Sequence, residues 1–513
     1  MKRFILPGIT LLMLALFFST TVVAVEKEEE KVLTVVSPWR LKGMNLHKSG
    51  FLFARMGCVE TLTTTDNRGK IVGLLARSWT VSPDRLTWTF TLRPDITFHD
   101  QTPLTAGAVS KSLNIALKNR GVLAKAKIAE ITPISPRTLR ITTTQPFAPL
   151  PAYLAHYSAA IVSEGSFDEQ GRLKHIYGTG PYILTGQQGD IRFDFKANPS
   201  YWGEKPQVQY VRHLGIPEAK TRANMILNGE ADMAFTLSPA DMEELQAAEG
   251  VRVVALTIPR TRLLVLNCAL PFFSTVRSRQ ALSLAIDRRG IAADMLRNPN
   301  SMATQLLPYA AAMWHTPELI PLEYNLLQAR KMLEEDGWQP GEDDILEKNG
   351  QRFEFELRTY STRPMLPVIA ASLQQQLRKV GIEMHVVVGK GSDIPAHRAD
   401  NTLQAALIAR NFALIPDAIG TIYNDFGPDP GNWGAFHWQS DELNELLERY
   451  LETFDQERAE ALRVDILTVL QRELPVIPIS WYEHIIGLSD RIEGVNIDPY
   501  ELKSYLNGVR WAR

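Results

Sequence analysis

Residues 75–106 read LARSWTVSPDRLTWTFTLRPDITFHDQTPLTA, and this stretch indicates the fold class. Polar and apolar side chains alternate over residues 87–92, which is the period of a half-buried β-strand. The turn Ser82-Pro83-Asp84 separates that strand from an extended segment around Trp79. The pattern then changes to that of a helix over residues 105–117, with Thr105 as its N-cap. Strands followed closely by a helix predict an α/β or α+β protein.

The rest of the chain continues this mixture of helices and strands. Pro478 lacks the N–H group that a central strand needs, so it predicts that the strand around it lies at a sheet edge. Gly229, Gly337 and Gly381 follow three of the expected helices, where glycine commonly forms a C-terminal cap. Strands are expected over residues 32–36, 139–143 and 476–481. Helices are expected over residues 221–228, 276–291, 326–333, 365–380 and 442–474, the last with an interruption near residue 453.

The composition excludes several classes of protein. The 513 residues are 45% hydrophobic and 22% charged, as in ordinary globular proteins, and are too many for one small core. The net charge of −2 gives no reason to expect a nucleic-acid partner. Cys58 and Cys268 are too few for a disulfide framework or a four-thiolate metal site, and the sequence leaves open whether they pair.

The N-terminus has the pattern of a secretory signal peptide. Lys2 and Arg3 precede an apolar run over residues 4–18, and small residues lead to an expected cleavage after Ala24. An uncleaved membrane anchor is the alternative interpretation. No later stretch approaches about 18 continuous apolar residues. We therefore expect residues 1–24 to be a signal peptide and the remaining chain to lie in the periplasm.

The sequence lacks the common catalytic patterns. It contains no G-x-S-x-G, H-E-x-x-H or C-x-x-C motif, and its 10 histidines are scattered. We therefore predict that the protein is not an enzyme and has no intrinsic cofactor. A periplasmic hydrolase is the alternative from another class, and a sensor or chaperone-like binder is a third. Trp433 lies in the loop-like segment PGNWG, and aromatic residues on loops often line small-molecule sites.

Ordered landmarks over nearly the whole chain after residue 24 resemble a known family. This family is the bacterial extracellular solute-binding proteins, family 5, the periplasmic peptide- and nickel-binding proteins of ABC importers. Each landmark is weak by itself, but the ordered set is specific. The landmarks include LARSW (75–79), SPD (82–84), LTWTFTLR (86–93), FHD (98–100), LTA (104–106), GTGPY (178–182), YWGEKP (201–206), TRA (221–223), GEAD (229–232), AIDR (285–288) and LEEDGW (333–338).

The resemblance implies an α/β, two-lobed periplasmic-binding-protein (Venus flytrap) fold of the large class, with an extra subdomain in lobe one. Mapped onto this chain, lobe one covers residues 26–257, lobe two covers 258–475, and residues 476–513 return to lobe one. Such proteins close about a hinge on a small ligand, and the closed form is presented to an ABC permease in the inner membrane. We expect the protein to be a monomer.

Two features of the sequence bear on the ligand. Peptide-binding members of the family hold the amino terminus of the peptide with an aspartate, and the aligned segment 411–418 has Leu414 at that position. Leucine cannot balance a buried ammonium group. YWGEKP, EKNGQ (347–351) and TYSTRP (359–364) resemble the nickel-binding members instead. The sequence therefore favours nickel or another metal chelate as ligand, with an oligopeptide or dipeptide as the alternative.

Nickel-binding members hold the chelate with an arginine, aromatic residues and sometimes one histidine. The segment 156–159, where their arginine lies, has no arginine here. Arg410 offers a planar set of donors for chelate carboxylates, and His437 offers a neutral nitrogen for nickel. A rim salt bridge for Arg410 and a surface turn for His437 are the alternatives. The predicted ligand-binding residues are Arg55 and Tyr157 from lobe one and Arg410, Phe412, Trp433 and His437 from lobe two, with His437 as the predicted metal ligand.

Overall fold

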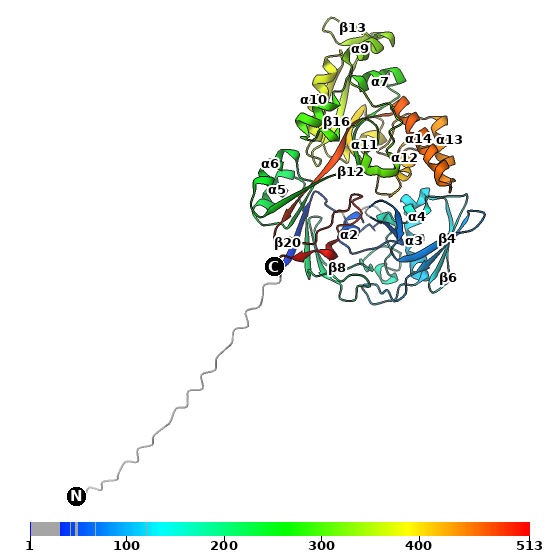
Figure 1. The fold of residues 1–513 in the computed structure, drawn as a ribbon, viewed down its shortest axis with the longest axis vertical. Helices are drawn as coiled ribbons and strands as arrows, with labels where there is room; N and C mark the ends of the chain where they lie inside the picture. The colour runs from blue at the N-terminus through cyan, green and yellow to red at the C-terminus, as the bar shows by residue number, and fades with distance from the viewer. Residues whose placement is uncertain (2–30, 42, 47–49, 67, 120) are drawn as a thin grey trace. The chain divides into compact units, whose positions relative to one another are not determined.

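The computed structural model describes residue 1 and residues 31–513 except 42, 47–49, 67 and 120 (Figure 1). Apart from its first residue, the predicted signal peptide therefore lies outside the described residues. Within the described part, no helix has the length and apolar character needed to cross a membrane. Cys58 and Cys268 are both buried and free, so they do not form a disulfide.

A mixed sheet of ten strands forms the centre of residues 32–513. Its parallel and antiparallel pairs come from segments far apart in the sequence. From one edge to the other, the strands are β17 (Glu383–Gly389), β16 (Glu354–Tyr360), β18 (Ala405–Asn411), β12 (Val251–Leu266), β19 (Val476–Ser489), β11 (Met233–Phe235), β1 (Val32–Ser37), β10 (Tyr210–Gly215), β9 (Arg192–Ala197) and β8 (Tyr182–Gln188).

Strands β12 and β19 join the two halves of this sheet (Figure 1). They are 16 and 14 residues long and pair antiparallel from Val251↔Ser489 to Val265↔Val476. Strand β18 pairs with the second half of β12, whereas β11 pairs with the end of β19. The register of the β12–β19 pair shifts between Ile258 and Thr261, where the two halves meet. Such a shift marks a β-bulge, which bends and twists a strand.

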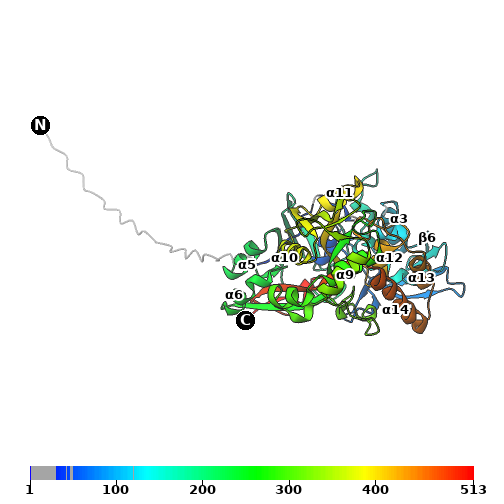
Figure 2. The same cartoon turned by 90° about the horizontal axis from the view of Figure 1, so that it is seen from above.

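Helices cover the sheet through apolar stripes. In α10 (Leu366–Arg378), the buried residues Leu366, Ile369, Leu373 and Leu377 recur at helical spacing and pack on β16, β17 and β18. Helices α13 and α14 run side by side (Figure 2). Apart from α3, described below, the other α-helices of four or more residues in the described part of the chain are α2 (Phe51–Arg55), α4 (Leu150–Tyr153), α5 (Ala219–Leu227), α6 (Met242–Ala247), α7 (Val276–Leu284), α9 (Leu326–Glu335), α11 (Asp393–Ala399), α12 (Ile419–Phe426), α13 (Asp441–Leu451) and α14 (Gln456–Glu473). The short strands outside the ten-stranded and four-stranded sheets are β2 (Thr63–Thr65), β3 (Ile71–Gly73), β13 (Gln339–Pro340), β14 (Leu346–Lys348), β15 (Gln351–Arg352), β20 (Ile492–Glu493) and β21 (Arg510–Trp511).

A separate four-stranded sheet forms from the stretch that opened the sequence analysis. Its order is β4 (Ala76–Val81), β5 (Thr87–Leu92), β7 (Thr138–Thr143) and β6 (Ile128–Ser135). Helix α3 (Ala106–Lys118) packs on it, and the Thr105 side chain accepts a hydrogen bond from the Ala108 backbone N–H at 3.1 Å. The predicted strand over 87–92 and the N-cap of the following helix are thus confirmed.

Two local predictions need correction. The helix expected over 276–291 ends at Leu284 because the chain turns there, and the buried Arg288 guanidinium donates to the carbonyls of Ser283 and Pro478. The strand around Pro478 does not lie at the edge of the ten-stranded sheet, since β19 is flanked by β12 and β11. Strand β11 pairs only with Ile486–Leu488, however, so β12 is the only named strand beside Pro478. On the side of β19 that faces away from β12, no named strand pairs at Pro478, so its missing N–H group breaks no strand pairing there.

Candidate functional site

Four arginines gather where β12 and β19 cross between the two halves of the sheet, and we call them the arginine cluster. Arg260 and Arg262 lie on β12 and Arg363 follows β16, whereas Arg55 ends α2. Arg55, Arg260 and Arg262 are 6%, 4% and 3% exposed. The guanidinium carbons of Arg260, Arg262 and Arg363 lie 5.0, 4.4 and 5.6 Å from the centre of the Tyr482 ring. One aromatic face on β19 therefore helps to hold three like charges together.

One carboxylate, that of Glu501, enters the arginine cluster from the C-terminal segment. Its Oε2 lies 2.6 Å from Arg260 Nη2 and accepts a hydrogen bond from Asn411 Nδ2 at 3.0 Å. Arg55 Nη2 lies 3.7 Å from Oε1, and Arg55 Nε donates to the Glu501 backbone carbonyl at 2.7 Å. Burial alone would raise the pKa of Glu501, but Arg260 and Arg55 lower it to about 2. Glu501 is therefore ionised at neutral pH.

Asp498 acts electrostatically on Arg55 and Glu483 acts on Arg262, so that with Glu501 three carboxylates face the four arginines of the cluster. Within the described structure, Arg260 Nε and Nη1, Arg262 Nε and Arg363 Nη1 are buried without a hydrogen-bond partner. Burial lowers the pKa of Arg260 and of Arg262 to about 10, so both stay charged at neutral pH. Unpaired buried charge is costly, and guanidinium groups bind carboxylates with matching geometry. The site is therefore suited to a ligand with carboxylate groups.

Aromatic rings and a buried histidine fix the Arg55 side of the cluster. The Arg55 guanidinium carbon lies 4.0 Å from the centre of the Trp39 ring, which in turn stacks on His213. His484 Nδ1 lies 3.9 Å from Glu501 Oε1. Burial lowers the pKa of His484 to about 3, so its imidazole is neutral at neutral pH, and its Nε2 lies 3.4 Å from Thr236 Oγ1.

Two small cavities adjoin the arginine cluster. One, of about 30 Å³, is lined by Tyr157, Leu414, Glu501 and Lys503 among others. The other, of about 10 Å³, is lined by Arg55, His484 and Glu501 among others. Each volume is on the order of one or two water molecules. A ligand of several carboxylates would therefore need the two halves of the sheet, or the segment that carries Glu501, to move apart.

The structure brings two of the predicted residues together at this site. Arg55 belongs to the arginine cluster, and Tyr157 lines the larger of the two small cavities and packs edge-on against Phe51 at 5.9 Å between ring centres. Burial raises the pKa of Tyr157, while the charges of Arg55 and Arg410 oppose that rise. Arg410 itself donates to both oxygens of the buried Asp425, at 2.5 and 2.8 Å. Its charge is therefore balanced within the protein.

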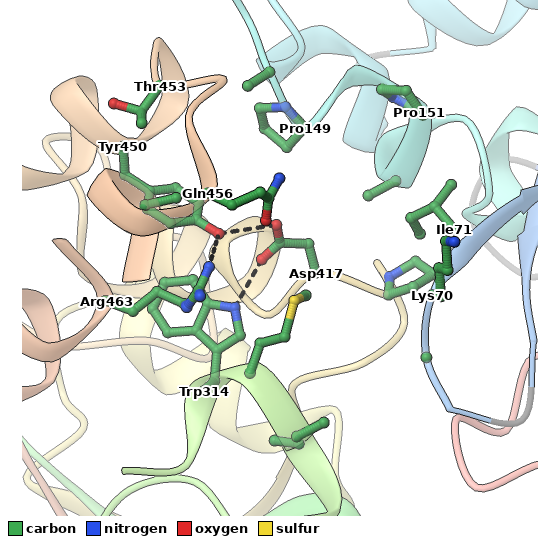
Figure 3. A pocket seen from close by; sticks show the side chains of 18 of the residues that line it. Lys70, Ile71, Pro149, Pro151, Trp314, Asp417, Tyr450, Thr453, Gln456 and Arg463 are labelled. Atoms are coloured by element: carbon green, nitrogen blue, oxygen red, sulfur yellow. Dashed lines mark hydrogen bonds between the residues drawn. The ribbon is translucent and has the colours of Figure 1, made fainter. Parts of the chain in front are cut away.

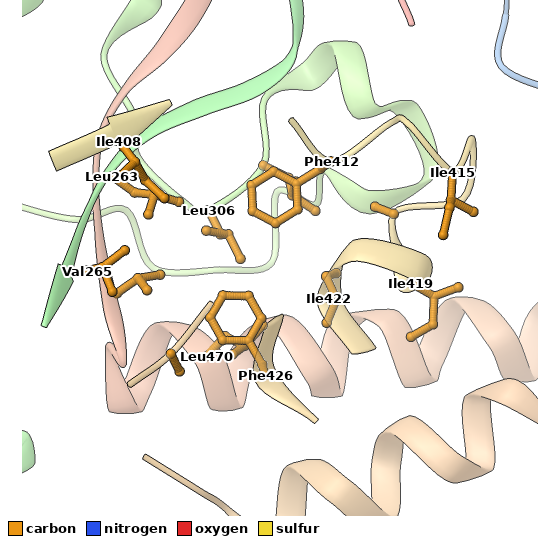
Figure 4. Packing of buried hydrophobic residues seen from close by; sticks show 14 of the residues in the cluster. Leu263, Val265, Leu306, Ile408, Phe412, Ile415, Ile419, Ile422, Phe426 and Leu470 are labelled. Carbon is orange, nitrogen blue, oxygen red and sulfur yellow. The ribbon is translucent and has the colours of Figure 1, made fainter. Parts of the chain in front are cut away.

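Phe412, Trp433 and His437 lie in other surroundings. Phe412 is 1% exposed and packs among Leu306 and Phe426 in the hydrophobic core, and its ligand contact stays a prediction (Figure 4). Trp433 is half-buried, edge-on to Tyr360 at 6.4 Å between ring centres.

His437, the predicted metal ligand, is exposed. Its Nε2 lies 2.6 Å from Asn401 Oδ1. The described residues contain no group of three or more His, Cys, Asp or Glu side chains placed to hold a metal ion. Among these residues His437 therefore belongs to no three-ligand group, and its metal contact stays a prediction.

Sequence reasoning missed most of the arginine cluster. Arg260 and Arg262 are separated by one residue in a long apolar segment, so a strand places both on one face, and this signal could have identified them. Glu501 carries no comparable local signal. It reaches the site because the chain returns after β19, and its backbone adopts the left-handed region at φ 57°.

The family model described as "Bacterial extracellular solute-binding proteins, family 5 Middle" matches residues 70–435, which is more than half of the chain. The chain belongs to this family. The predicted family is thereby confirmed.

Curated relatives and solved structures agree with this assignment. The nickel-binding periplasmic protein of Escherichia coli (strain K12) is 27% identical over 474 residues, covering 89% of each chain. The glutathione-binding protein GsiB of the same strain is 26% identical over 454 residues, covering 85% of each. NikA from Staphylococcus aureus in complex with Ni(L-His)2 has a TM-score of 0.82 at 21% identity, covering 94% of this chain and 100% of that one. AppA from Bacillus subtilis with a nonapeptide has a TM-score of 0.81 at 19% identity, covering 94% and 99%. The two-lobed periplasmic-binding-protein fold is confirmed.

Proposed function

We propose that this protein is the solute-binding component of an ABC importer, and that it captures a metal chelate whose carboxylates bind the arginine cluster. The observation that carries the proposal is the excess of buried guanidinium groups over carboxylates at the junction of the two sheet halves. The nickel-binding relative and the nickel–histidine complex of NikA from Staphylococcus aureus support a chelate as ligand. In this function the protein has no catalytic step and no resident cofactor.

The proposed lobes explain why the ligand would favour closure. We assign residues 26–257 and 476–513 to lobe one and residues 258–475 to lobe two, so that the boundary falls beside the register shift after Ile258. Arg55 then belongs to lobe one, whereas Arg260, Arg262 and Arg363 belong to lobe two. A ligand carboxylate that contacts arginines of both lobes binds the closed form better and shifts the population towards it.

Nickel would arrive with its own chelator. The described residues hold no group of three or more His, Cys, Asp or Glu side chains placed to hold a metal ion, so they do not by themselves form a coordination sphere for nickel. An amino-acid chelate such as nickel–histidine carries carboxylates for the arginine cluster. His484, which is neutral and buried beside Glu501, is better placed than His437 to approach such a ligand.

A peptide remains the second candidate. Leu414 lines the cavity of about 30 Å³ beside the arginine cluster and provides no charge for a peptide ammonium group. Glu60 and Glu501, however, line the same cavity. The carboxylates of a peptide would also suit the arginine cluster. The glutathione-binding relative, whose identity to this chain is close to that of the nickel-binding one, supports this alternative.

The transport role requires export, a monomeric carrier and a permease. We propose that the protein acts in the periplasm after removal of residues 1–24 and delivers its ligand to an inner-membrane permease as a monomer. The periplasmic relatives support this location.

Isothermal titration calorimetry distinguishes the candidate ligands. The purified chain would be titrated with nickel plus L-histidine, with nickel alone, with glutathione and with a panel of dipeptides and oligopeptides. We expect tight binding of nickel with histidine and weaker binding of nickel alone. Tight peptide binding with no response to nickel would replace the chelate with the peptide alternative. Turnover of an ester, peptide or glycoside would instead support a hydrolase.

A further inference from the structure

A cavity of about 500 Å³ lies between the four-stranded sheet and helices α13 and α14, and no member of the arginine cluster lines it. Figure 3 shows Pro149, Pro151 and Ile71 facing Tyr450 and Trp314 across an open space. Cavities of this size hold small organic molecules. We call this space the aromatic cavity.

Rings and apolar side chains form most of its wall. Trp314 and Tyr450 are 1% and 6% exposed, with ring centres 5.2 Å apart. Trp79 and Trp88, from β4 and β5, also line the cavity. Such a wall offers apolar contacts to a flat apolar ligand.

The single carboxylate in the wall, that of Asp417, already has partners. It accepts hydrogen bonds from Trp314 Nε1 at 2.8 Å and from Tyr450 Oη at 3.2 Å (Figure 3). The Ile419 backbone N–H donates a third, at 3.0 Å. Burial raises its pKa. A cationic ligand would therefore find little unused negative charge here.

Some polar groups in the wall of the aromatic cavity lack a hydrogen-bond partner within the described structure, and these are N–H donors. Arg463, in the middle of α14, is 7% exposed, and its one side-chain hydrogen bond within the described structure is a long one, 3.4 Å from Nη1 to Tyr450 Oη. Arg463 Nε and Trp88 Nε1 are buried without a partner in that same part of the chain. The exposed Arg68 and Lys70 add positive charge to the wall. Asp417 acts electrostatically on Arg463, and both contact Tyr450 Oη, but the unpartnered Arg463 Nε leaves an N–H donor that can bind a carboxylate.

We propose that the aromatic cavity binds a carboxylate that carries an aromatic or similarly flat apolar group. Arg463 binds the carboxylate, and the ring packs against Trp314 and Tyr450. Two sources have this chemistry, a free aromatic acid and the C-terminal residue of a peptide that ends in an aromatic side chain. The site is separate from the arginine cluster, so it does not depend on the proposed capture of a metal chelate.

Titration of the full chain with 3-phenylpropionate and with its neutral amide tests the charge requirement. The two compounds have the same ring and nearly the same size, and the quenching of tryptophan fluorescence and calorimetry both report binding. Because a charged hydrogen bond is lost, we expect the amide to bind about tenfold to a hundredfold more weakly than the acid. Equal affinities, or no binding of the acid, would overturn the proposal without any variant.

Arg463→Gln should weaken binding of the acid to the level of the amide. Arg458→Gln is the matched control, since Arg458 is exposed on the same helix, α14, and should leave the affinity unchanged. Unchanged affinity in a folded Arg463→Gln variant would overturn the proposal.

The dipeptide Ala-Phe separates the two sources, because a site for peptide termini binds it and a site for free acids does not. Nickel–histidine affinity of Arg463→Gln should equal that of the parent. The same variant therefore tests the aromatic cavity independently of the proposed function at the arginine cluster.

Discussion

Replacing Glu501 with glutamine measures how strongly the arginine cluster depends on the Glu501 carboxylate. Glu501 Oε2 lies 2.6 Å from Arg260, and Oε1 lies 3.7 Å from Arg55. Burial alone would raise the pKa of Glu501, but these arginines lower it from the ordinary 4.5 to about 2. Since each tenfold preference for the ionised form is worth ~1.4 kcal/mol, this ionisation stabilises the folded chain by about 3 kcal/mol.

The direction of the pKa change fixes the pH dependence. Because the pKa of Glu501 is lower in the folded chain than in the unfolded one, the stabilisation is complete above pH 4.5 and is lost as the pH falls towards 2. Glu501→Gln should therefore unfold with about 3 kcal/mol less free energy than the parent at neutral pH. The difference between the two proteins should shrink steadily as the solution is acidified below pH 4.5.

Urea denaturation followed by tryptophan fluorescence, at neutral pH and in a series of acidic buffers, measures this difference. Glu493→Gln is the matched control, because Glu493 forms an exposed ion pair with Arg510 at 2.9 Å. Its loss should cost less than about 1 kcal/mol. Equal losses in the two variants, or a Glu501→Gln deficit that does not change with pH, would refute the electrostatic role of Glu501.

Three further substitutions test the residues that were predicted from the sequence. Phe412→Ala should lower the free energy of unfolding by about 3–5 kcal/mol in urea titrations, because it opens a cavity in the core, while nickel–histidine affinity measured on the folded variant stays unchanged. His437→Ala should alter neither quantity by a measurable amount, and a lost nickel response would contradict this. Arg410→Gln should destabilise the chain by about 3 kcal/mol, because it leaves the buried Asp425 without its partner, yet calorimetry should show parental ligand affinity.

The parts of the fold that local sequence patterns could predict are those that depend on neighbours in the chain. The alternation over residues 87–92 and the Thr105 cap are short-range signals, and both appear as expected. The end of α7 at Leu284 depends on Arg288 reaching the carbonyl of Pro478, a contact across the chain that no local pattern reveals.

The site was harder to predict than the fold for the same reason. Arg55, which was predicted, lies in the arginine cluster, whereas Arg410 does not. Arg410 and Arg260 each pair with a carboxylate, and within the described structure the difference is that Arg260 keeps two buried nitrogens without a partner, which no local pattern reveals. Phe412 is apolar in a segment that aligns with ligand contacts, and only its burial distinguishes a core residue from a cleft residue. Glu501 comes from a C-terminal return of the chain, and no spacing connects it with β12.

Binding of nickel with L-histidine to an arginine-cluster variant tests the central proposal most directly. Arg363 is half-buried and less tightly packed than Arg260, so Arg363→Gln should fold. Arg352→Gln is the matched control, since Arg352 pairs at the surface with Asp343 and Glu383. Calorimetry should show affinity about tenfold or more weaker for Arg363→Gln and unchanged for Arg352→Gln. Parental affinity in the Arg363 variant would contradict capture of the ligand by the arginine cluster.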